Sequence, residues 1–158
     1  MKNTTKNIGA GLVEVVVGVS LILVTLVGLV SAYNLFLKAA LKNTEIVQAN
    51  FLIEEGLEVV RVIRDSGWTS NITPLSQGTE YDVVNDAGEW KATTSISLID
   101  GKFYRVVNIF DVLRDGNDDI SISGTPDPNT KLFTVTVSWL EGNATSSRSL
   151  STYLTKIF

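Results

Sequence analysis

The pattern of apolar and polar positions divides this chain into an N-terminal apolar run and a mixed remainder. No charged residue occurs from Val15 to Leu37, and only a few hydroxyl and amide side chains interrupt the run. As an α-helix, these 23 residues measure about 35 Å, which is enough to cross a hydrocarbon core of about 30 Å. The run therefore predicts a helix that can span a membrane.

Beyond Leu37 the apolar positions follow the spacing of one helix face. Successive members lie three or four residues apart and are Ile46, Ala49, Ile53, Leu57, Val60 and Ile63. Asp65-Ser66-Gly67 is a typical helix stop, because glycine tolerates the backbone angles that follow a last turn. We predict one continuous helix from about Ala10 to about Asp65, apolar in its first half and amphipathic in its second.

After Gly67 the period of the pattern falls from 3.6 to 2, which is typical of strands. Strands are expected near 81–84, 90–98, 103–112, 132–139 and 149–158, with turn-forming residues between them. An antiparallel sheet with one apolar face needs a cover, and the face over residues 46–63 can supply it. The predicted fold class is α+β: a long N-terminal helix packed on an antiparallel β-sheet head. The polar loop 115–130 is the one segment expected to be disordered.

Composition narrows the function classes. The 158 residues suit one ordinary domain plus its helix, and they include neither cysteine nor histidine. A disulfide framework, a thiolate metal site and a thiol nucleophile are therefore excluded, and the commonest general base is missing. No glycine-rich phosphate loop is present either. We expect no enzyme and no cofactor.

Net charge bears on the choice of partners. The formal charge is −4, and loss of a leader containing Lys2 and Lys6 would leave 11 basic against 17 acidic residues, or −6. No polybasic patch remains to neutralise a phosphate backbone. Specific binding of nucleic acid is therefore not expected.

Glu14 stands at the head of the apolar run. A carboxylate within a membrane span costs about 2.5–3.5 kcal/mol even on insertion scales that tolerate charge well. Protonation, a position near the membrane surface or a cationic partner must offset that cost. A plain membrane anchor has no use for such a residue.

Two simpler interpretations of the apolar run remain open. A secretory signal peptide also begins with basic residues, and Val30-Ser31-Ala32 fits the small-residue rule for cleavage, but its apolar core is usually only 7–15 residues long. An uncleaved signal anchor fits the length equally well, although it leaves Gly9 and Glu14 unexplained.

The first residues together carry a more specific signal. A short leader with Lys2 and Lys6 ends at Gly9, and a glutamate follows as the fifth residue after that glycine. This pattern resembles the cleavage and methylation signal of type IV prepilins and type II secretion pseudopilins. The chain departs from the usual family pattern with Ala10 in place of phenylalanine and Gly11 in place of threonine. It also has Ser31 where many family helices have a proline.

The resemblance implies a processing scheme and a domain layout. A prepilin peptidase would cut between Gly9 and Ala10 and N-methylate Ala10, and Glu14 would take part in assembly. The implied parts are a leader (1–9), a transmembrane and filament-core half of the helix (10–37), an amphipathic half (38–66) and a β-sheet head (67–158).

The same resemblance implies a function. The chain would be a structural subunit of a type IV pilus or a related filament, held as a single-pass protein in the cytoplasmic membrane before assembly and displayed at the cell surface afterwards. Expected partners are copies of itself or other pilins, the prepilin peptidase, the inner-membrane assembly machinery and, before assembly, membrane lipid. The alternative is a single-pass membrane-anchored extracytoplasmic binding domain.

Two further sequence features have more than one interpretation. Asp115, Asn117 and Asp119 are spaced like the first ligands of an EF-hand loop, but Ile120 replaces the required glycine and no glutamate stands at the twelfth place. A calcium loop, as in some pseudopilins, and a solvated acidic loop both stay open, and no residue is assigned as a metal ligand. Asn71 and Asn143 begin glycosylation triplets and are expected at the surface.

Overall fold

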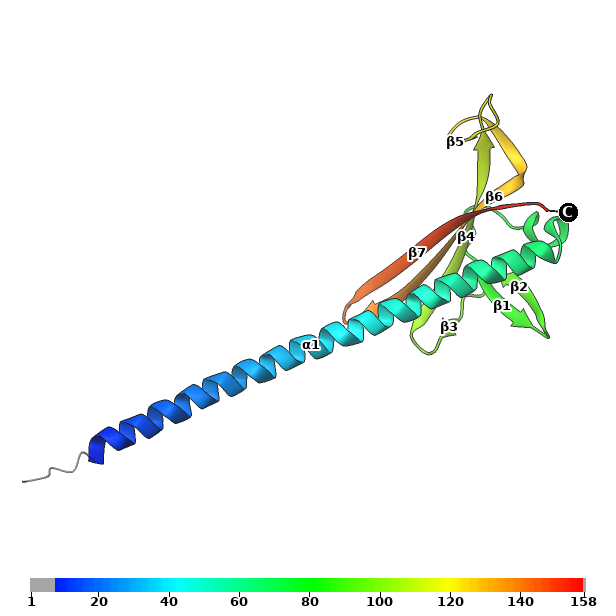
Figure 1. Ribbon diagram of the computed structural model, residues 1–158. Coiled ribbons are helices and arrows are strands. Elements are labelled where there is room, and N and C mark those ends of the chain that lie inside the picture. The colour runs from blue at the N-terminus through cyan, green and yellow to red at the C-terminus, as the bar shows by residue number, and fades with distance from the viewer. Residues whose placement is uncertain (1–7, 158) are drawn as a thin grey trace, which may run out of the picture. The chain divides into compact units, whose positions relative to one another are not determined.

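The computed structural model describes residues 8–157, and for residues 8–10 it describes the backbone alone. One long helix, α1, runs from Ile8 to Asp65, and the rest of the chain is mainly antiparallel β-structure (Figure 1). The predicted fold class is confirmed, and so is the position of the helix end. Residues 1–7 of the expected leader lie outside the described residues.

The chain divides into two compact units at Thr44/Glu45. We call the described part of the first unit, residues 8–44, the N-terminal segment, and residues 45–157 the head. After α1 the head contains the π-helical turn η1 (Trp68–Ile72) and the strands β1 (Asp82–Asp86), β2 (Glu89–Thr93), β3 (Leu98–Ile99), β4 (Phe103–Arg114), β5 (Ile120–Ser121), β6 (Thr125–Glu141) and β7 (Ala144–Thr155).

The strands of the head form two antiparallel sheets. β1 and β2 make a hairpin, while the larger sheet has the order β3-β4-β6-β7, with β5 added to the end of β4. Val135 in the middle of β6 pairs with Val107 of β4 on one side and Leu150 of β7 on the other. This register places alternate residues of three long strands on one face, as the period of 2 predicts.

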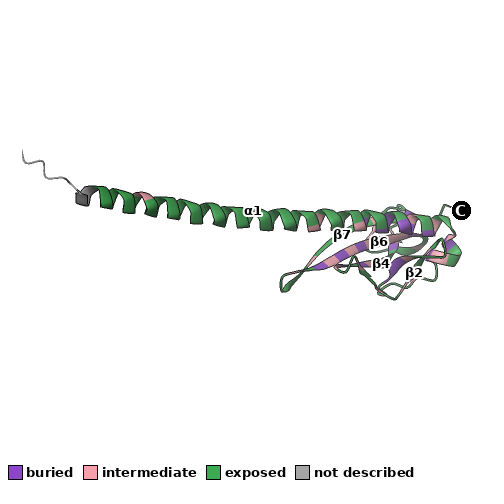
Figure 2. Cartoon of the chain, turned by 90° about the horizontal axis from the view of Figure 1, so that it is seen from below, coloured by how far each residue is buried: buried purple, intermediate pink, exposed green. Residues whose placement is uncertain are grey.

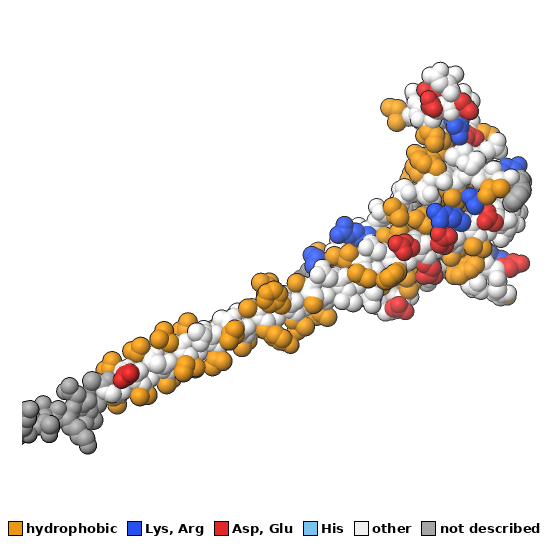
Figure 3. All heavy atoms as spheres, in the orientation of Figure 1, with side chains coloured by type: hydrophobic (Ala, Val, Ile, Leu, Met, Phe, Trp, Pro, Cys, Tyr) orange, Lys and Arg blue, Asp and Glu red, His pale blue; other side chains and the backbone are white. Residues whose placement is uncertain are grey.

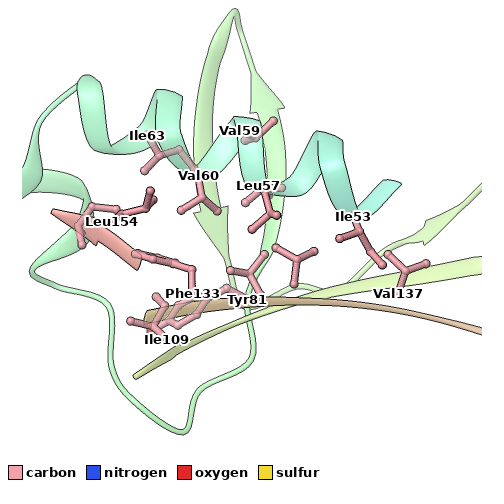
Figure 4. Packing of buried hydrophobic residues seen from close by; sticks show 14 of the residues in the cluster. Ile53, Leu57, Val59, Val60, Ile63, Tyr81, Ile109, Phe133, Val137 and Leu154 are labelled. Atoms are coloured by element: carbon pink, nitrogen blue, oxygen red, sulfur yellow. The ribbon is translucent and has the colours of Figure 1, made fainter. Parts of the chain in front are cut away.

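The core lies between the second half of α1 and the larger sheet. Ala49, Ile53, Leu57, Val60 and Ile63 of the predicted helix face are all buried (Figure 2). Figure 4 shows several of them beside strand residues such as Phe133 and Val137. Burial of each large apolar side chain contributes about 1.5–3 kcal/mol, so this contact holds the head together. The predicted packing of the 46–63 face on the sheet is confirmed.

Gly56 allows α1 to approach the sheet closely. A Cβ at this position would lie 2.9 Å from a methyl group of Val135 and 3.1 Å from Cδ of Arg105. The sequence alone marks this glycine as a weak point of the helix, because glycine costs about 1 kcal/mol relative to alanine. The structure explains it as the residue that leaves room for two side chains of the sheet.

Several boundaries differ from the predictions. The loop 115–130 is not disordered throughout, because β5 lies within it and β6 begins at Thr125. The single strand expected over 90–98 is two strands, separated by four irregular residues. The alternation over 149–158 predicts that Leu150 points into the core, but it is 50 % exposed because β7 is the edge strand of the sheet. The polar composition after Gly67 predicts a loop over 68–78, but the structure has a π-helical turn there that buries Trp68 and Ile72.

Candidate functional site

The N-terminal segment presents apolar side chains around its whole circumference. Every residue from Gly11 to Thr44 is exposed except Gly18, which is half-buried. Figure 3 shows apolar side chains along almost all of this part of the helix. A helix that is apolar all round is stable only in lipid or among other apolar surfaces. By length and composition, α1 is long and apolar enough to cross a membrane.

Three serine and threonine side chains interrupt the apolar surface between Val15 and Leu37, and each hydroxyl is satisfied within the helix. Ser20 donates to the carbonyl of Val16 at 2.7 Å, and Thr25 donates to that of Ile22 at 2.8 Å. Ser31 donates to a carbonyl one turn earlier, also at 2.8 Å. A polar group in hydrocarbon must find such an internal partner, because no water is there to replace it.

Glu14 differs from these hydroxyls. Its side chain is exposed, and no hydrogen bond or ion pair joins it to any residue from 11 to 157. The backbone of Gly9 and Ala10 belongs to the first turns of α1, so Glu14 lies about 6 Å along the axis from Ala10. Side-chain positions at Gly9 and Ala10 lie outside the description. The structure therefore places the predicted processing and assembly residues on one short stretch of helix.

Glu45, the first residue of the head, links α1 to the larger sheet through hydrogen bonds. Its carboxylate accepts a hydrogen bond from Nζ of Lys102 at 2.6 Å and another from Nε1 of Trp139 at 3.1 Å. Lys102 lies in the turn before β4 and Trp139 lies in β6, both far along the chain from Glu45, so no local sequence pattern predicts this contact. The residue marks the point at which α1 becomes part of the core.

A buried ion pair joins β1 to β4. Arg105 lies on the inner face of β4, and its Nε donates to Asp82 at 3.4 Å while its Nη2 donates to the carbonyl of Val83 at 2.8 Å. The other oxygen of Asp82 accepts from the backbone N–H and the hydroxyl of Ser97, at 3.3 and 2.8 Å. Glu55 of α1 approaches Arg105 Nη1 to 3.5 Å. Arg105 Nη1 is buried and makes no hydrogen bond, so Glu55 supplies only an electrostatic contact there. The other polar groups of Asp82 and Arg105 are paired within the head, which indicates a structural role.

An arginine also organises the far end of the larger sheet. We call residues 112–127 the arm, because the β4–β6 register shifts between Asp111 and Val112 and β5 is added beyond that point. Arg114 donates to Asp127 at 2.7 Å, to the carbonyl of Asp118 at 2.7 Å and to the hydroxyl of Thr130 at 3.5 Å. A Cβ on Gly124 would lie 2.0 Å from the Arg114 carbonyl oxygen, so only glycine fits there. The arm therefore has a defined conformation that these contacts hold in place.

Asp127 should make the arm sensitive to acid. Its hydrogen bond from Arg114 lowers the pKa of Asp127 from 3.8 to about 2. Because the folded pKa is the lower one, the stabilisation is complete above about pH 4 and is lost as the pH falls through 2. We expect Asp127→Asn to lower the free energy of unfolding by about 1 kcal/mol at pH 7, a value reduced for solvent screening.

Urea unfolding of the full chain in detergent, measured at pH 7 and pH 2, tests this expectation. The difference between wild type and Asp127→Asn should shrink at pH 2, where the wild-type carboxylate is half protonated. Asp86→Asn is the matched control, because its partner Lys91 is exposed and the pair contributes little. A difference that stays constant between the two pH values would contradict the assignment.

The carboxylate of Asp115 is engaged with the backbone of the arm. One carboxylate oxygen of Asp115 accepts hydrogen bonds from the N–H groups of Asn117 and Asp119, at 2.8 and 3.1 Å. Within residues 8–157, no group of three or more Asp or Glu side chains is placed to hold a metal ion. The hydrogen bonds within this loop are those of a tight turn. This geometry fits the interpretation of the segment as a solvated acidic loop.

The two glycosylation triplets have different surroundings. The amide of Asn71 is half-buried and donates to the carbonyl of Ile63 at 3.4 Å, near the end of α1. Asn143 is exposed in the turn between β6 and β7. The expected surface position is confirmed for Asn143, whereas Asn71 is only partly exposed and its side chain helps to close the helix end.

Comparison with known proteins gives no further identification. No family model, curated protein or solved structure matches the chain.

Proposed function

We propose that this protein is a structural subunit of a type IV pilus or a pilus-like filament, processed by a prepilin peptidase and assembled through its N-terminal helix. One observation carries the proposal. In a helix segment whose surface is mainly apolar and whose serine and threonine hydroxyls are internally satisfied, Glu14 alone presents a carboxylate, and no residue from 11 to 157 pairs with it. A cation from another molecule is a partner that would offset the cost of burying such a group among apolar helices.

Processing supplies that cation. Cleavage after Gly9 converts the amide nitrogen of Ala10 into an amino group that is positively charged near neutral pH. Methylation leaves an amine that still carries this charge. The new terminus of one copy then pairs with Glu14 of its neighbour. Because an unpaired carboxylate among apolar helices is costly, this contact also fixes how far neighbouring subunits are displaced along the filament.

The proposal assigns each part of the chain a place. Before assembly the protein is a single-pass component of the cytoplasmic membrane, in contact with lipid, the peptidase and the assembly machinery. After assembly the apolar helices form the filament interior at the cell surface. The second half of α1 supports this division of labour, because it buries one face on its own sheet and leaves charged residues on the other.

A membrane-anchored binding domain is the second candidate. It accounts for the apolar helix and the folded head, and the structure describes a surface cavity of about 460 Å³ in the head. It gives no role to Glu14, although a carboxylate in a membrane span has a free-energy cost. The filament subunit is therefore the better-supported proposal.

Processing can be tested directly. We expect the mature protein to begin at an N-methylated Ala10, because Gly9 and Glu14 flank the site at the spacing of the prepilin signal. Gly9→Ser should block cleavage and leave membrane insertion unchanged, since the apolar run is untouched. Mass spectrometry of the membrane-extracted protein reads both results.

Gly18→Ser is the matched control for that experiment. It makes the same chemical change in the same helix, nine residues from Gly9 and away from the cut, so normal processing is expected. A wild-type protein that keeps Met1, or one that begins at Tyr33, would contradict the proposal. The first result would favour an uncleaved anchor and the second a secretory signal peptide.

A further inference from the structure

The arm ends in an exposed apolar projection. Ile122 is 100 % exposed and Ile120 is 47 % exposed, an unusual degree of exposure for two β-branched apolar side chains on an ordered segment. They lie near Leu132 and Tyr153 of the larger sheet, around a shallow hollow. The Arg114 hydrogen bonds and Gly124 hold the arm in place, so its tip is presented by a defined structure.

An apolar pocket lies at the other end of the same sheet. Its volume is about 460 Å³, and it is lined by Leu98, Gly101, Lys102, Tyr104, Ser138, Trp139, Leu140 and Thr145. Leu98, Tyr104 and Leu140 around it are 48 %, 46 % and 69 % exposed. Nothing else within residues 45–157 fills this hollow.

The projection and the pocket share one face of the sheet. Leu132 and Tyr153 pair across β6 and β7, and Tyr104 and Ser138 pair across β4 and β6. Both pairs alternate with the buried residues, so both lie on the face opposite α1. From Tyr104 to Leu113 along β4 the distance is about 30 Å at ~3.3 Å per residue.

A polar band separates the two apolar sites. On this face the middle of the sheet carries hydroxyl groups, and Thr134 and Ser151 are hydrogen-bonded to each other at 2.8 Å across β6 and β7. The apolar surface is therefore divided into one protruding and one hollow site, at opposite ends of the strands. Since they lie far apart in one head, the projection cannot fill the pocket of its own molecule.

We propose that the tip of the arm, Ile120 and Ile122, inserts into the pocket around Leu140 of a second copy of this chain. The contact is head to tail, because it joins two different surfaces. When copies point the same way, such a contact does not close on itself and continues from one copy to the next. The inference rests on the proposed function in this one respect, that neighbouring copies are parallel.

The distribution of charge also favours the arm of a second copy as the occupant of the pocket. The arm carries Asp115, Asp118 and Asp119, all exposed. The only charged residue among those lining the pocket is Lys102, whose side chain remains 36 % exposed although it contacts Glu45. Lys102 is already paired with Glu45, but the pocket lining contains no acidic residue, so the acidic segment beside the apolar tip meets no like charge there. Arm-to-arm contact would instead bring the aspartates of two copies together, which disfavours that pairing.

The absence of cysteine from the natural chain allows a clean cross-linking test. Ile122→Cys and Leu140→Cys are combined in the full chain, and both the protein purified in detergent and the sheared surface fraction of cells are oxidised. The expected result is a ladder of dimers, trimers and longer species. Adding Ile120→Asp should lower the yield about tenfold or more, because it places a charge in the apolar contact.

Ile122→Cys combined with Ser149→Cys is the matched control, since Ser149 is exposed on the same face but lies in the polar band. A ladder of equal yield from this pair, a dimer of equal yield from Ile122→Cys alone, or no ladder in either preparation would overturn the proposal. The site of cleavage is read on the same samples by mass spectrometry. A ladder without cleavage after Gly9 would remove the proposed processing and keep this contact, whereas cleavage without a ladder would do the reverse.

Discussion

Glu14→Gln is expected to abolish or sharply reduce filament assembly while the monomer accumulates in the membrane. The substitution keeps the size of the side chain and removes its charge, so insertion should persist or improve. Cleavage after Gly9 should persist as well, because the leader and the peptide bond are unchanged. The amino terminus of a neighbouring copy is then left without its carboxylate. Loss of one partner from a buried pair costs about 3–5 kcal/mol, and in a filament the loss recurs at every subunit.

Electron microscopy and immunoblotting of sheared surface fractions measure this effect, with membrane fractions as the reference. Glu54→Gln is the matched control, because Glu54 is an exposed glutamate of the same helix within the head. It makes the same chemical change away from the apolar segment, so normal filament levels are expected. Normal filament levels in Glu14→Gln would contradict the assembly role and favour the membrane-anchored binding domain.

Asp82→Ala is expected to destabilise the head by about 3–5 kcal/mol. Asp82 is 1 % exposed, and its removal leaves the guanidinium of Arg105 buried without its main counter-charge. Glu55 is half exposed at 3.5 Å and offsets only part of that loss. The hydroxyl and N–H of Ser97 also lose their acceptor. Since a single domain is stable by only about 5–15 kcal/mol, this change removes a large share of the total.

Urea unfolding of the full chain in detergent, followed by the fluorescence of the buried residues Trp68 and Trp139, measures this loss. The double variant Asp82→Val/Arg105→Met should recover much of it, because apolar residues of similar size can replace a buried ion pair with little loss. Lys91→Ala is the control for an exposed pair and should change the free energy by less than about 1 kcal/mol. A loss equally small in Asp82→Ala would show that the pair has no structural role.

Many features of the fold could be predicted from the sequence because they depend on local periodicity. The apolar run and the 46–63 face each repeat with the helical period, so they specify α1 to within a few residues of its observed bounds. Alternation at period 2 specifies β4 and the centre of β6 in the same way. The roles proposed for Gly9, Ala10 and Glu14 are likewise predicted from the sequence alone, because their spacing within one short segment is itself the signal.

The residues that join distant parts of the chain were decided by the tertiary structure. Arg105 stands among apolar residues of an alternating strand, which signals an inward charge, but its partner Asp82 is identified only when β1 is placed beside β4. Glu45 reaches Trp139 across 94 residues of sequence, and no local pattern connects them.

The structure at the ends and edge of the larger sheet also depends on tertiary contacts. The segment 115–130 is polar and turn-rich, so the sequence predicts disorder, yet the Arg114 hydrogen bonds organise it into the arm. Leu150 alternates correctly for a core position and is nevertheless half exposed, because β7 is the edge strand. Local periodicity determines which face a side chain occupies. Whether that face is covered depends on which elements pack against it, and only the assembled head decides that.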